Sequence, residues 1–315
     1  MTTPVAVLDQ SGTGQYSQFT ETSGGASIPT SYIDFPWAAY PGLTGIASDP
    51  NPMLVFSVYT YPYPWAQPIS ASFGGNACII GPYAYNSPYS GQPQRTLQIF
   101  LLPVTSSMTF AVSPGGSNYV RFSITYPGSV NVGNFAMCGE MLAFTNVDPV
   151  GTALFASTNT EIDKGTGGSP TVWALTGSVT GNAGDCLFCG SCSYDWSAGT
   201  QGVGAYQNIF APAGYSQSTG GNSTPGIRLV SAYRTLTVNS TDTLTWEATG
   251  SFVNQLDGFV QFVLKAAGPT IPTIGGIEGK FVGAKVFKPI ELSNLAGAIP
   301  RIYPVLDDSV VRIKP

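Results

Sequence analysis

Short apolar or alternating runs, separated by Gly, Pro, Asn and Ser, are the feature that most constrains the fold of this chain. In the run YVRFSITY (119–126), Val120, Phe122 and Ile124 fall on one face of an extended strand, and the residues between them fall on the other. The same reasoning predicts further strands at 53–61, 96–104, 108–113, 135–144, 171–180, 226–238, 243–252 and 258–266. One short helical turn is expected at 290–298. This pattern predicts an all-β protein, a jelly-roll or Greek-key β-sandwich with long loops and extended terminal arms.

Composition divides the chain into a body and two ends. Residues 1–30 are polar and rich in Gly, Ser and Thr, which predicts a flexible N-terminal arm. Residues 31–266 are expected to form the β-sandwich body, in which 146–170 is either one long loop or the division between two sub-domains. Residues 267–315 carry six prolines yet remain apolar, which predicts an extended C-terminal arm that covers a surface of the same chain or of a neighbour. The residues expected to make the arm contacts are Phe281, Val286, Phe287, Ile302 and Tyr303.

Charge is scarce and unevenly placed. Only 9% of the residues are charged, against about 25% in ordinary globular proteins. The first 94 residues contain no Lys or Arg, and the first 265 hold six basic and thirteen acidic residues, a net charge of −7. The last fifty hold six basic and four acidic residues, a net charge of +2. An acidic body with a mildly basic tail suits contact between subunits, but not direct nucleic-acid binding, which needs a concentrated basic face.

Several classes of function are disfavoured by what the sequence lacks. The chain contains no histidine, which excludes Ser–His and Cys–His nucleophile pairs and His-ligated metals. The first ten residues have neither a positive n-region nor an apolar h-region, so no Sec signal peptide is expected. No apolar run reaches the length of about eighteen residues that a membrane helix needs, so no membrane partner is expected.

Two Tyr-rich stretches, VYTYPYPW (58–65) and GPYAYNSPYSGQP (81–93), contain no charged residue. Tyr and Trp are enriched at interfaces because they bury much area with few rotatable bonds, and their rings can also stack on sugars. The preferred interpretation is packing in a loop or at a subunit contact, and the alternative is a ligand platform. The residues concerned are Tyr59, Tyr61, Tyr63, Trp65, Tyr83, Tyr85 and Tyr89.

The run CLFCGSC places Cys186, Cys189 and Cys192 at C-x2-C spacing twice. This spacing is typical of thiolate metal sites, for which Cys78 or Cys138 could supply a fourth ligand. The chain has five cysteines, an odd number, so at least one stays unpaired within the chain. Disulfides, within or between subunits, and plain loop thiols are both favoured over a metal or cluster site. No cofactor is therefore expected.

Other polar residues offer weaker candidates. The acidic residues of 161–163, with Asp185 and Asp195, lie on Gly-rich loops and have the oxygen ligands that calcium prefers. Their spacing does not match a D-x-D-x-D loop, which favours solvated loop charges. The N-x-T sequons at Asn222 and Asn239 are expected to stay unused because no signal peptide is expected.

In overall style the chain resembles virion structural proteins, both jelly-roll capsid or decoration proteins and phage tail or fibre proteins. The resemblance rests on few charges, abundant Gly, Pro, Ser and Thr, many short strands and an apolar extended arm, and no motif identifies a particular family. It implies a non-enzymatic protein of the virion whose arms tie neighbouring copies and other virion proteins together. RNA-virus coat proteins often carry a basic N-terminal arm. The absence of a basic N-terminal arm from this chain suits a protein on the exterior of the particle, or a shell around a genome that other molecules neutralise.

The sequence supports three hypotheses. The leading one is a virion structural protein that self-assembles through apolar and aromatic contacts and its C-terminal arm. The second is a receptor- or glycan-binding fibre or lectin-like module, whose Tyr- and Trp-rich loops hold a host-surface glycan. The third is a β-sandwich hydrolase exported by a non-Sec route. It would need two of Glu140, Glu161 and Glu247 to stand about 5–9 Å apart.

Overall fold

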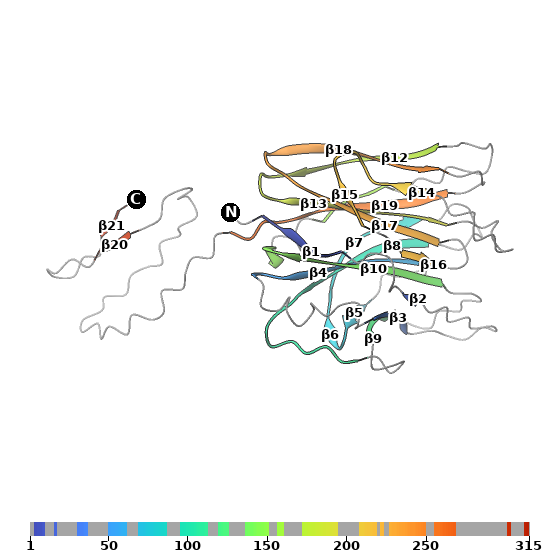
Figure 1. Ribbon diagram of the computed structural model, residues 1–315, viewed down its shortest axis with the longest axis horizontal. Coiled ribbons are helices and arrows are strands. Elements are labelled where there is room, and N and C mark those ends of the chain that lie inside the picture. The colour runs from blue at the N-terminus through green and yellow to red at the C-terminus, as the bar shows by residue number, and fades with distance from the viewer. Residues whose placement is uncertain are drawn as a thin grey trace. The chain divides into compact units, whose positions relative to one another are not determined.

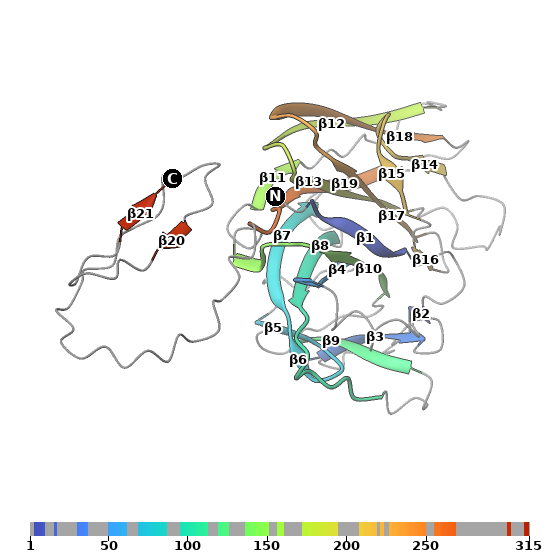
Figure 2. The ribbon, with the colours of Figure 1, turned by 60° about the vertical axis from the view of Figure 1, so that its left-hand side comes forward.

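A computed structural model of the chain (Figures 1 and 2) divides into two compact units, Met1–Thr270 and Ile271–Pro315. We call the first unit the body. The structure describes residues 3–9, 16–17, 30–36, 50–61, 69–86, 95–112, 119–125, 136–150, 156–160, 172–194, 208–218, 221–223, 227–249, 255–268, 301–303 and 312–314. Every element with defined bounds is a β-strand, which confirms the predicted all-β class. In the second unit, β20 (Arg301–Tyr303) and β21 (Arg312–Lys314) form an antiparallel pair.

Two antiparallel sheets lie at the centre of the body, and we call them the inner sheets. The first inner sheet has the order β1-β10-β4-β8-β7. Its strands are β1 (Val5–Asp9), β10 (Ala136–Thr145), β4 (Met53–Tyr61), β8 (Arg95–Pro103) and β7 (Ile79–Asn86). The second inner sheet has the order β11-β19-β13-β17-β15, and β16 also pairs with β17. Its strands are β11 (Ala156–Thr160), β19 (Gln255–Leu264), β13 (Cys186–Tyr194), β17 (Ile227–Thr235), β15 (Ser216–Gln217) and β16 (Gly221–Ser223).

Two outer sheets complete the body. The first outer sheet has the order β2-β3-β9-β5-β6, and the second has the order β12-β18-β14. The strands of the first are β2 (Tyr16–Ser17), β3 (Thr30–Pro36), β9 (Tyr119–Thr125), β5 (Ser70–Phe73) and β6 (Asn76–Ala77). Those of the second are β12 (Val172–Gly181), β18 (Ser240–Thr249) and β14 (Asn208–Phe210).

The two halves of the body repeat one strand order. In the inner sheets, β1, β10, β4, β8 and β7 correspond in position and in chain order to β11, β19, β13, β17 and β15. In the outer sheets, the order β3-β9-β5 corresponds to β12-β18-β14. Each half is therefore a jelly roll whose chain passes between an inner and an outer sheet. We call residues 5–145 the first roll and residues 156–264 the second roll.

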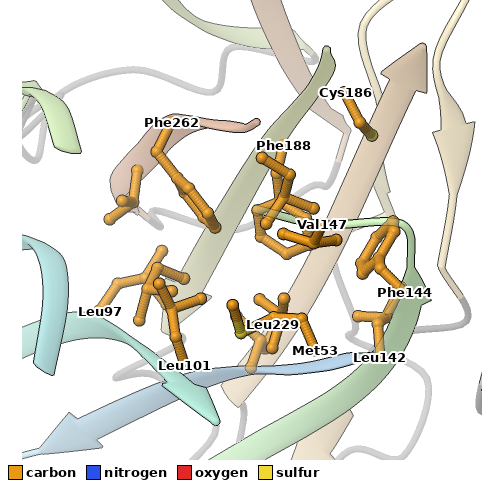
Figure 3. Close-up of a cluster of buried hydrophobic side chains, with 14 of the residues drawn as sticks. Met53, Leu97, Leu101, Leu142, Phe144, Val147, Cys186, Phe188, Leu229 and Phe262 are labelled. Carbon is orange, nitrogen blue, oxygen red and sulfur yellow. The ribbon is translucent and has the colours of Figure 1, made fainter. Parts of the chain in front are cut away.

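The four sheets stack as layers, with the two inner sheets face to face (Figures 1 and 2). Buried apolar side chains fill each of the three spaces between layers. The first outer core, which includes Phe56 and Phe122, lies within the first roll, and the second outer core, which includes Val230, lies within the second roll. The central core joins the two rolls and includes Phe144 and Phe188, whose rings meet edge to face with centroids 6.2 Å apart (Figure 3). Because this contact is a closed apolar core, the rolls form one body.

Burial on one or both faces explains why the strands differ in sequence. Along β9, half-buried and buried residues alternate strictly, because only one face of this outer strand meets a core. Strand β4 lies in an inner sheet, where Phe56 and Val58 face the first outer core, and Val55 and Tyr59 face the central core. A strand buried on both faces is expected to be a nearly continuous apolar run, and MLVFSVYTY is such a run.

Most of the predicted strands occur within a few residues of their expected bounds. The prediction for 53–61 coincides with β4, and that for 119–126 with β9 to within one residue. The predicted strand at 108–113 is wrong over its described residues, 108–112, of which only Val112 makes a bridge, whereas Met108 and Phe110 pack against the first outer core. Strands β3, β7 and β13 were not predicted, nor were the short strands β1, β2, β5, β6, β11, β14, β15, β16, β20 and β21. The helical turn at 290–298 lies outside the described residues. In the described part of the chain, no helix is long and apolar enough to span a membrane.

Candidate functional site

The Tyr-rich stretches contribute to the core as well as to the surface. Tyr59 has no exposed surface and packs in the central core, so it belongs neither to a subunit contact nor to a ligand platform. Tyr83 is half-buried on the edge strand β7, opposite Gln98 of β8. Tyr61 and Tyr85 lie on β4 and β7, but their side chains, like residues Tyr63, Trp65 and Tyr89, lie outside the described part.

The cysteine run is a buried strand, not a loop. In β13, Cys186 faces the central core and Cys189 faces the second outer core, on opposite sides of the sheet. Cys192 lies six residues beyond Cys186, about 20 Å along the strand. Cys186 and Cys189 are free thiols with at most 1% exposed surface, so this geometry excludes a shared metal ion, a disulfide between them and a disulfide to another subunit.

Burial also makes these thiols chemically inert. Removal from water raises the pKa of Cys186 to about 12 and raises the pKa of Cys189 well above the ordinary value for a thiol. Cys78, a half-buried free thiol beside the first outer core, has its pKa raised to about 12 for the same reason. Since the thiolate is the nucleophile and the metal ligand, none of the three is prepared for catalysis or metal binding.

The layers separate the carboxylates that a hydrolase would need. Glu140 is fully buried on β10, opposite Ser57 of β4, in the first inner sheet. Glu247 lies on β18 in the second outer sheet, so the second inner sheet stands between them. Packed sheets are about 10 Å apart, which puts these two strands about 20 Å apart. Glu140 and Glu247 therefore cannot act as a pair across one bond, and Glu161 lies outside the described residues.

The described part of the body also contains no cluster of three or more Cys, Asp and Glu side chains that could hold a metal ion. Among the acidic residues considered for calcium, Asp185 is buried, and the prediction of a solvated loop charge is wrong for it. Residues 161–163 and Asp195 lie outside the described part of the chain. Asp185 instead belongs to a network of bonds at one end of the body.

This network holds the segment through which the chain leaves the second roll, and we call it the exit anchor. It comprises Asn146, Val147 and Asp148 after the first roll, Lys265, Ala266 and Ala267 after the second roll, and Asp185. The two post-roll segments form a bridge between Val147 and Ala266. They also exchange a reciprocal pair of backbone hydrogen bonds, Asp148 N–H to Lys265 O (2.8 Å) and Ala267 N–H to Asn146 O (2.8 Å). The ends of the two jelly rolls are thus fastened to each other.

Asp185 fixes the second post-roll segment by its side chain. Its carboxylate accepts hydrogen bonds from the Lys265 ammonium (2.7 Å), from the Ala266 N–H (3.1 Å) and from the Asn182 N–H (2.9 Å). The side chains of Asp185 and Lys265 are only 5% and 15% exposed, so the ion pair is shielded from water. The Asp185 carbonyl accepts from Leu236 N–H (2.8 Å), which ties the same turn to the end of β17. Because these bonds are charge-assisted and largely buried, they hold Lys265 and Ala266 firmly at the end of the second roll.

Asn146 brings the N-terminal end of the body to the same place. Its backbone has a positive φ of 60°, a conformation in which Asn is enriched. Its amide side chain donates to the Thr3 carbonyl (3.3 Å), and its backbone N–H donates to the Pro50 carbonyl (2.6 Å). The Thr235 hydroxyl is 3.5 Å from the Pro4 carbonyl, which adds a second contact to the N-terminal segment. The beginning of the body, the connection between the rolls and the exit therefore meet at one end.

Two further ion pairs lie on the described strands of the body. Arg121 and Asp34 form a two-pronged pair on the first outer sheet, with both N–O distances 2.7 Å, and the guanidinium lies 3.6 Å from the ring centre of Tyr32. Hydrogen bonding to Asp34 raises the pKa of Arg121, so the group stays fully charged. In the second roll, Arg234 pairs with Asp242 at 2.9 Å. The first pair connects neighbouring strands of one sheet, and the second connects β17 of the second inner sheet to β18 of the second outer sheet, so the polar groups of both pairs are used in structure.

The C-terminal residues expected to make arm contacts belong to the second unit. Ile302 and Tyr303 lie on β20, where they pair with Ile313 and Arg312 of β21. Their side chains, and residues Phe281, Val286 and Phe287, lie outside the described part of the chain, so the arm contacts remain a prediction. Sequence reasoning did not find the exit anchor, although it placed an arm immediately after it.

Comparisons with known proteins identify no family. No protein-family model and no curated protein matches the chain. Two solved structures are similar in part. A cryo-EM structure of T=1 Penaeus vannamei nodavirus matches with 9% identity and a TM-score of 0.21, over 84% of this chain and 100% of that chain. A cryo-EM structure of T=3 Penaeus vannamei nodavirus matches with 13% identity and a TM-score of 0.19, over 84% of this chain and 90% of that chain. At these identities and TM-scores the similarity carries no functional argument.

Proposed function

We propose that this protein is a non-enzymatic structural component of a virus particle that self-assembles through its C-terminal segment. The observation that carries the proposal is the exit anchor, which fixes the start of an apolar, proline-rich segment on the body with a largely buried ion pair. A segment with no role beyond the body would not need its origin held in this way. Other copies of the chain and other components of the particle are its proposed partners.

The fold supports this proposal without establishing it. Jelly rolls occur in viral capsid proteins, but also in lectins and cupins, so fold alone does not fix a function. The three ion pairs reported above serve structural bonds, as does the buried hydrogen bond between the Ser57 and Ser231 hydroxyls (2.9 Å) across the central core. The low content of charged residues, 9%, further suits a chain that buries much of its surface in assembly.

The proposal is tested by removing the C-terminal unit. The truncated chain should end at Thr270, where the body ends, because ending at Lys265 would also remove the bonds of Ala266 and Ala267 to the anchor. We expect the full chain to form a multimer and the truncated chain to need at least about tenfold higher concentration to do so, because the apolar contacts are lost. Light scattering after size exclusion measures the mass, and electron microscopy shows whether particles form.

The control is the fold of the truncated chain. Its circular dichroism and its denaturant midpoint should match those of the full chain, since the strands of both jelly rolls end before Thr270. A full chain that stays monomeric at every concentration would refute the proposed function. So would a truncated chain that builds the same multimer.

A further inference from the structure

Large exposed apolar side chains gather around the exit anchor. In the described part of the chain, three of them border it: Val5 (51% exposed), Val150 (68%) and Val238 (63%). Val5 follows Pro4, which contacts Thr235, and the Val150 N–H donates to the Asp148 carboxylate (3.0 Å). Val238 precedes Asn239, and this asparagine accepts a hydrogen bond from the turn that carries Asp185. Three residues from three distant parts of the sequence thus expose apolar surface at one end of the body.

Among the described residues, those exposed between these valines are uncharged. They are Pro50, Asn51, Asn182, Thr237, Asn239 and Gly268. The charged side chains beneath them, Asp185 and Lys265, are satisfied by each other. The half-buried Asp148 lies at the border of this surface, where its carboxylate accepts from the Val150 N–H. Arg234, which lies next to this surface, is paired with Asp242. We call this end of the body, formed by the three valines and the six residues around them, the exit face.

We propose that the exit face is a contact surface between two copies of this chain, each copy contributing the same face. The inference rests on the proposed self-assembly and locates one of its contacts. Interface centres are depleted in charged residues, and the exposed residues of this face are uncharged, so desolvating them together with the three valines costs little. Because like charges that face each other repel, the contact must keep the two Asp148 carboxylates at its rim.

The position of the exit favours a second copy over an unrelated partner. Gly268 lies within the exit face, two residues before the body ends at Thr270, so a contact between two such faces brings the starts of two C-terminal segments together. Segments that start beside a partner can be exchanged with it at little cost, which is a common route to stable homodimers. The contact and the C-terminal segment would then stabilise the same assembly.

The test uses four full-length variants that place a carboxylate on an exposed site. Val150→Asp and Val238→Asp lie on the exit face, whereas Ile69→Asp and Val112→Asp are matched controls on the first roll, with exposed fractions of 62% and 55%. Because all four sites are exposed, each variant should fold, and circular dichroism verifies this. We expect the exit-face variants to raise the concentration for half-maximal assembly at least about tenfold, because two copies of the new charge would face each other. The controls should stay within about twofold of the wild type.

Cross-linking identifies the partner surface directly. A photoreactive amino acid at position 150 in 15N-labelled chains, mixed with unlabelled chains before assembly, should give mixed-isotope cross-links to peptides that contain Pro50, Val150 or Val238. Cross-links confined to one copy, or to peptides from other surfaces, would overturn the inference. So would exit-face variants that assemble as the controls do while the wild type forms its multimer. A wild type that never assembles would instead refute the proposed function itself.

Discussion

The two jelly rolls end in the same way, but their ends are secured by different chemistry. After the first roll, Asn146 and Val147 donate their N–H groups to the carbonyls of Pro50 and Asn51, just before β4. After the second roll, Lys265 and Ala266 donate to the carboxylate of Asp185, just before the corresponding strand β13. The same step of the topology is thus held by backbone bonds in one roll and by a shielded ion pair in the other.

The difference follows from what comes next in the chain. The first roll continues into the second, whose packing across the central core holds the connection from both sides. The second roll continues into Ile271–Pro315, which forms a separate unit. An end that is not enclosed between two rolls needs stronger local bonds, and charge-assisted hydrogen bonds are roughly twice as strong as neutral ones. We call the ends of the first and second rolls the first exit and the second exit. The comparison predicts that changes to the ion-paired side chains destabilise the second exit, whereas the first exit has no ion pair to lose.

The largest expected effect is that of Asp185→Ala. Removing one partner of a buried ion pair costs about 3–5 kcal/mol, because the remaining groups lose their counter-charge or acceptor. Denaturant unfolding should show this loss, and hydrogen exchange should show faster exchange at the Ala266 amide, whose bond to the carboxylate disappears. Trypsin should also cleave after Lys265 more readily once this side chain is released.

A matched control for this change lies in the same roll. Asp242→Asn weakens the pair with Arg234, whose side chain is 44% exposed, so water screens the interaction and the loss should stay below about 1 kcal/mol. Trypsin cleavage after Lys265 should not change in this variant. Equal destabilisation by the two variants would contradict the special role of the second exit.

A smaller effect is expected at the first exit. Asn146→Ala should lower the free energy of unfolding by about 1–2 kcal/mol, because Ala is disfavoured at a positive φ and cannot bond to the Thr3 carbonyl. Asn146→Gly keeps the backbone conformation and should lose less than about 1 kcal/mol. Thermal or denaturant unfolding measures both. A Gly variant as unstable as the Ala variant would show that the side-chain bond, rather than the backbone conformation, dominates at this position.

The fold class could be predicted from alternation, but the layers could not. Strands with one buried face, such as β9, show period two, and strands such as β4 show a continuous apolar run. Strand β13 was missed because its Gly, Ser and Cys residues are weak strand formers. The structure shows what holds it as a strand: Phe188 packs in the central core and Cys189 in the second outer core. This burial on both faces comes from the neighbouring sheets and has no local signal.

The exit anchor was beyond sequence reasoning for a similar reason. Asp185 and Lys265 are eighty residues apart, and each alone reads as a solvated charge. Only the register of β13 against β19, which sets Cys186 opposite Leu264, brings the two residues together immediately beyond these strands. The apolar composition of the C-terminal segment was readable and led to the predicted arm. The bonds that hold its start depend on the duplicated topology, which no repeat in the sequence reveals.

The smallest expected effect concerns Cys186, the first residue of β13. Its counterpart in the first roll is Met53, the first residue of the corresponding strand β4, and both side chains face the central core. Only Cys186 can ionise. Burial raises its pKa from 9.0 to about 12, so well below pH 9 the thiol is neutral in both the folded and the unfolded state. Above pH 9 the unfolded chain loses this proton first, so the free energy of unfolding falls as the pH rises towards 12. At pH 9.5 the loss from this thiol is about 0.8 kcal/mol, and the first roll has no equivalent at Met53.

Cys186→Ala tests this sign without changing the other ionisable groups. Urea unfolding of both proteins at pH 8 and pH 9.5 gives two differences in stability, and the variant should lose about 0.8 kcal/mol less than the wild type over this interval. Packing lost in the variant cancels, because it contributes equally at both pH values. An equal loss in the two proteins would mean that Cys186 reaches water in the folded state. The second exit, which begins at the neighbouring Asp185, would then be open in solution, and the contrast between the two exits would have to be abandoned.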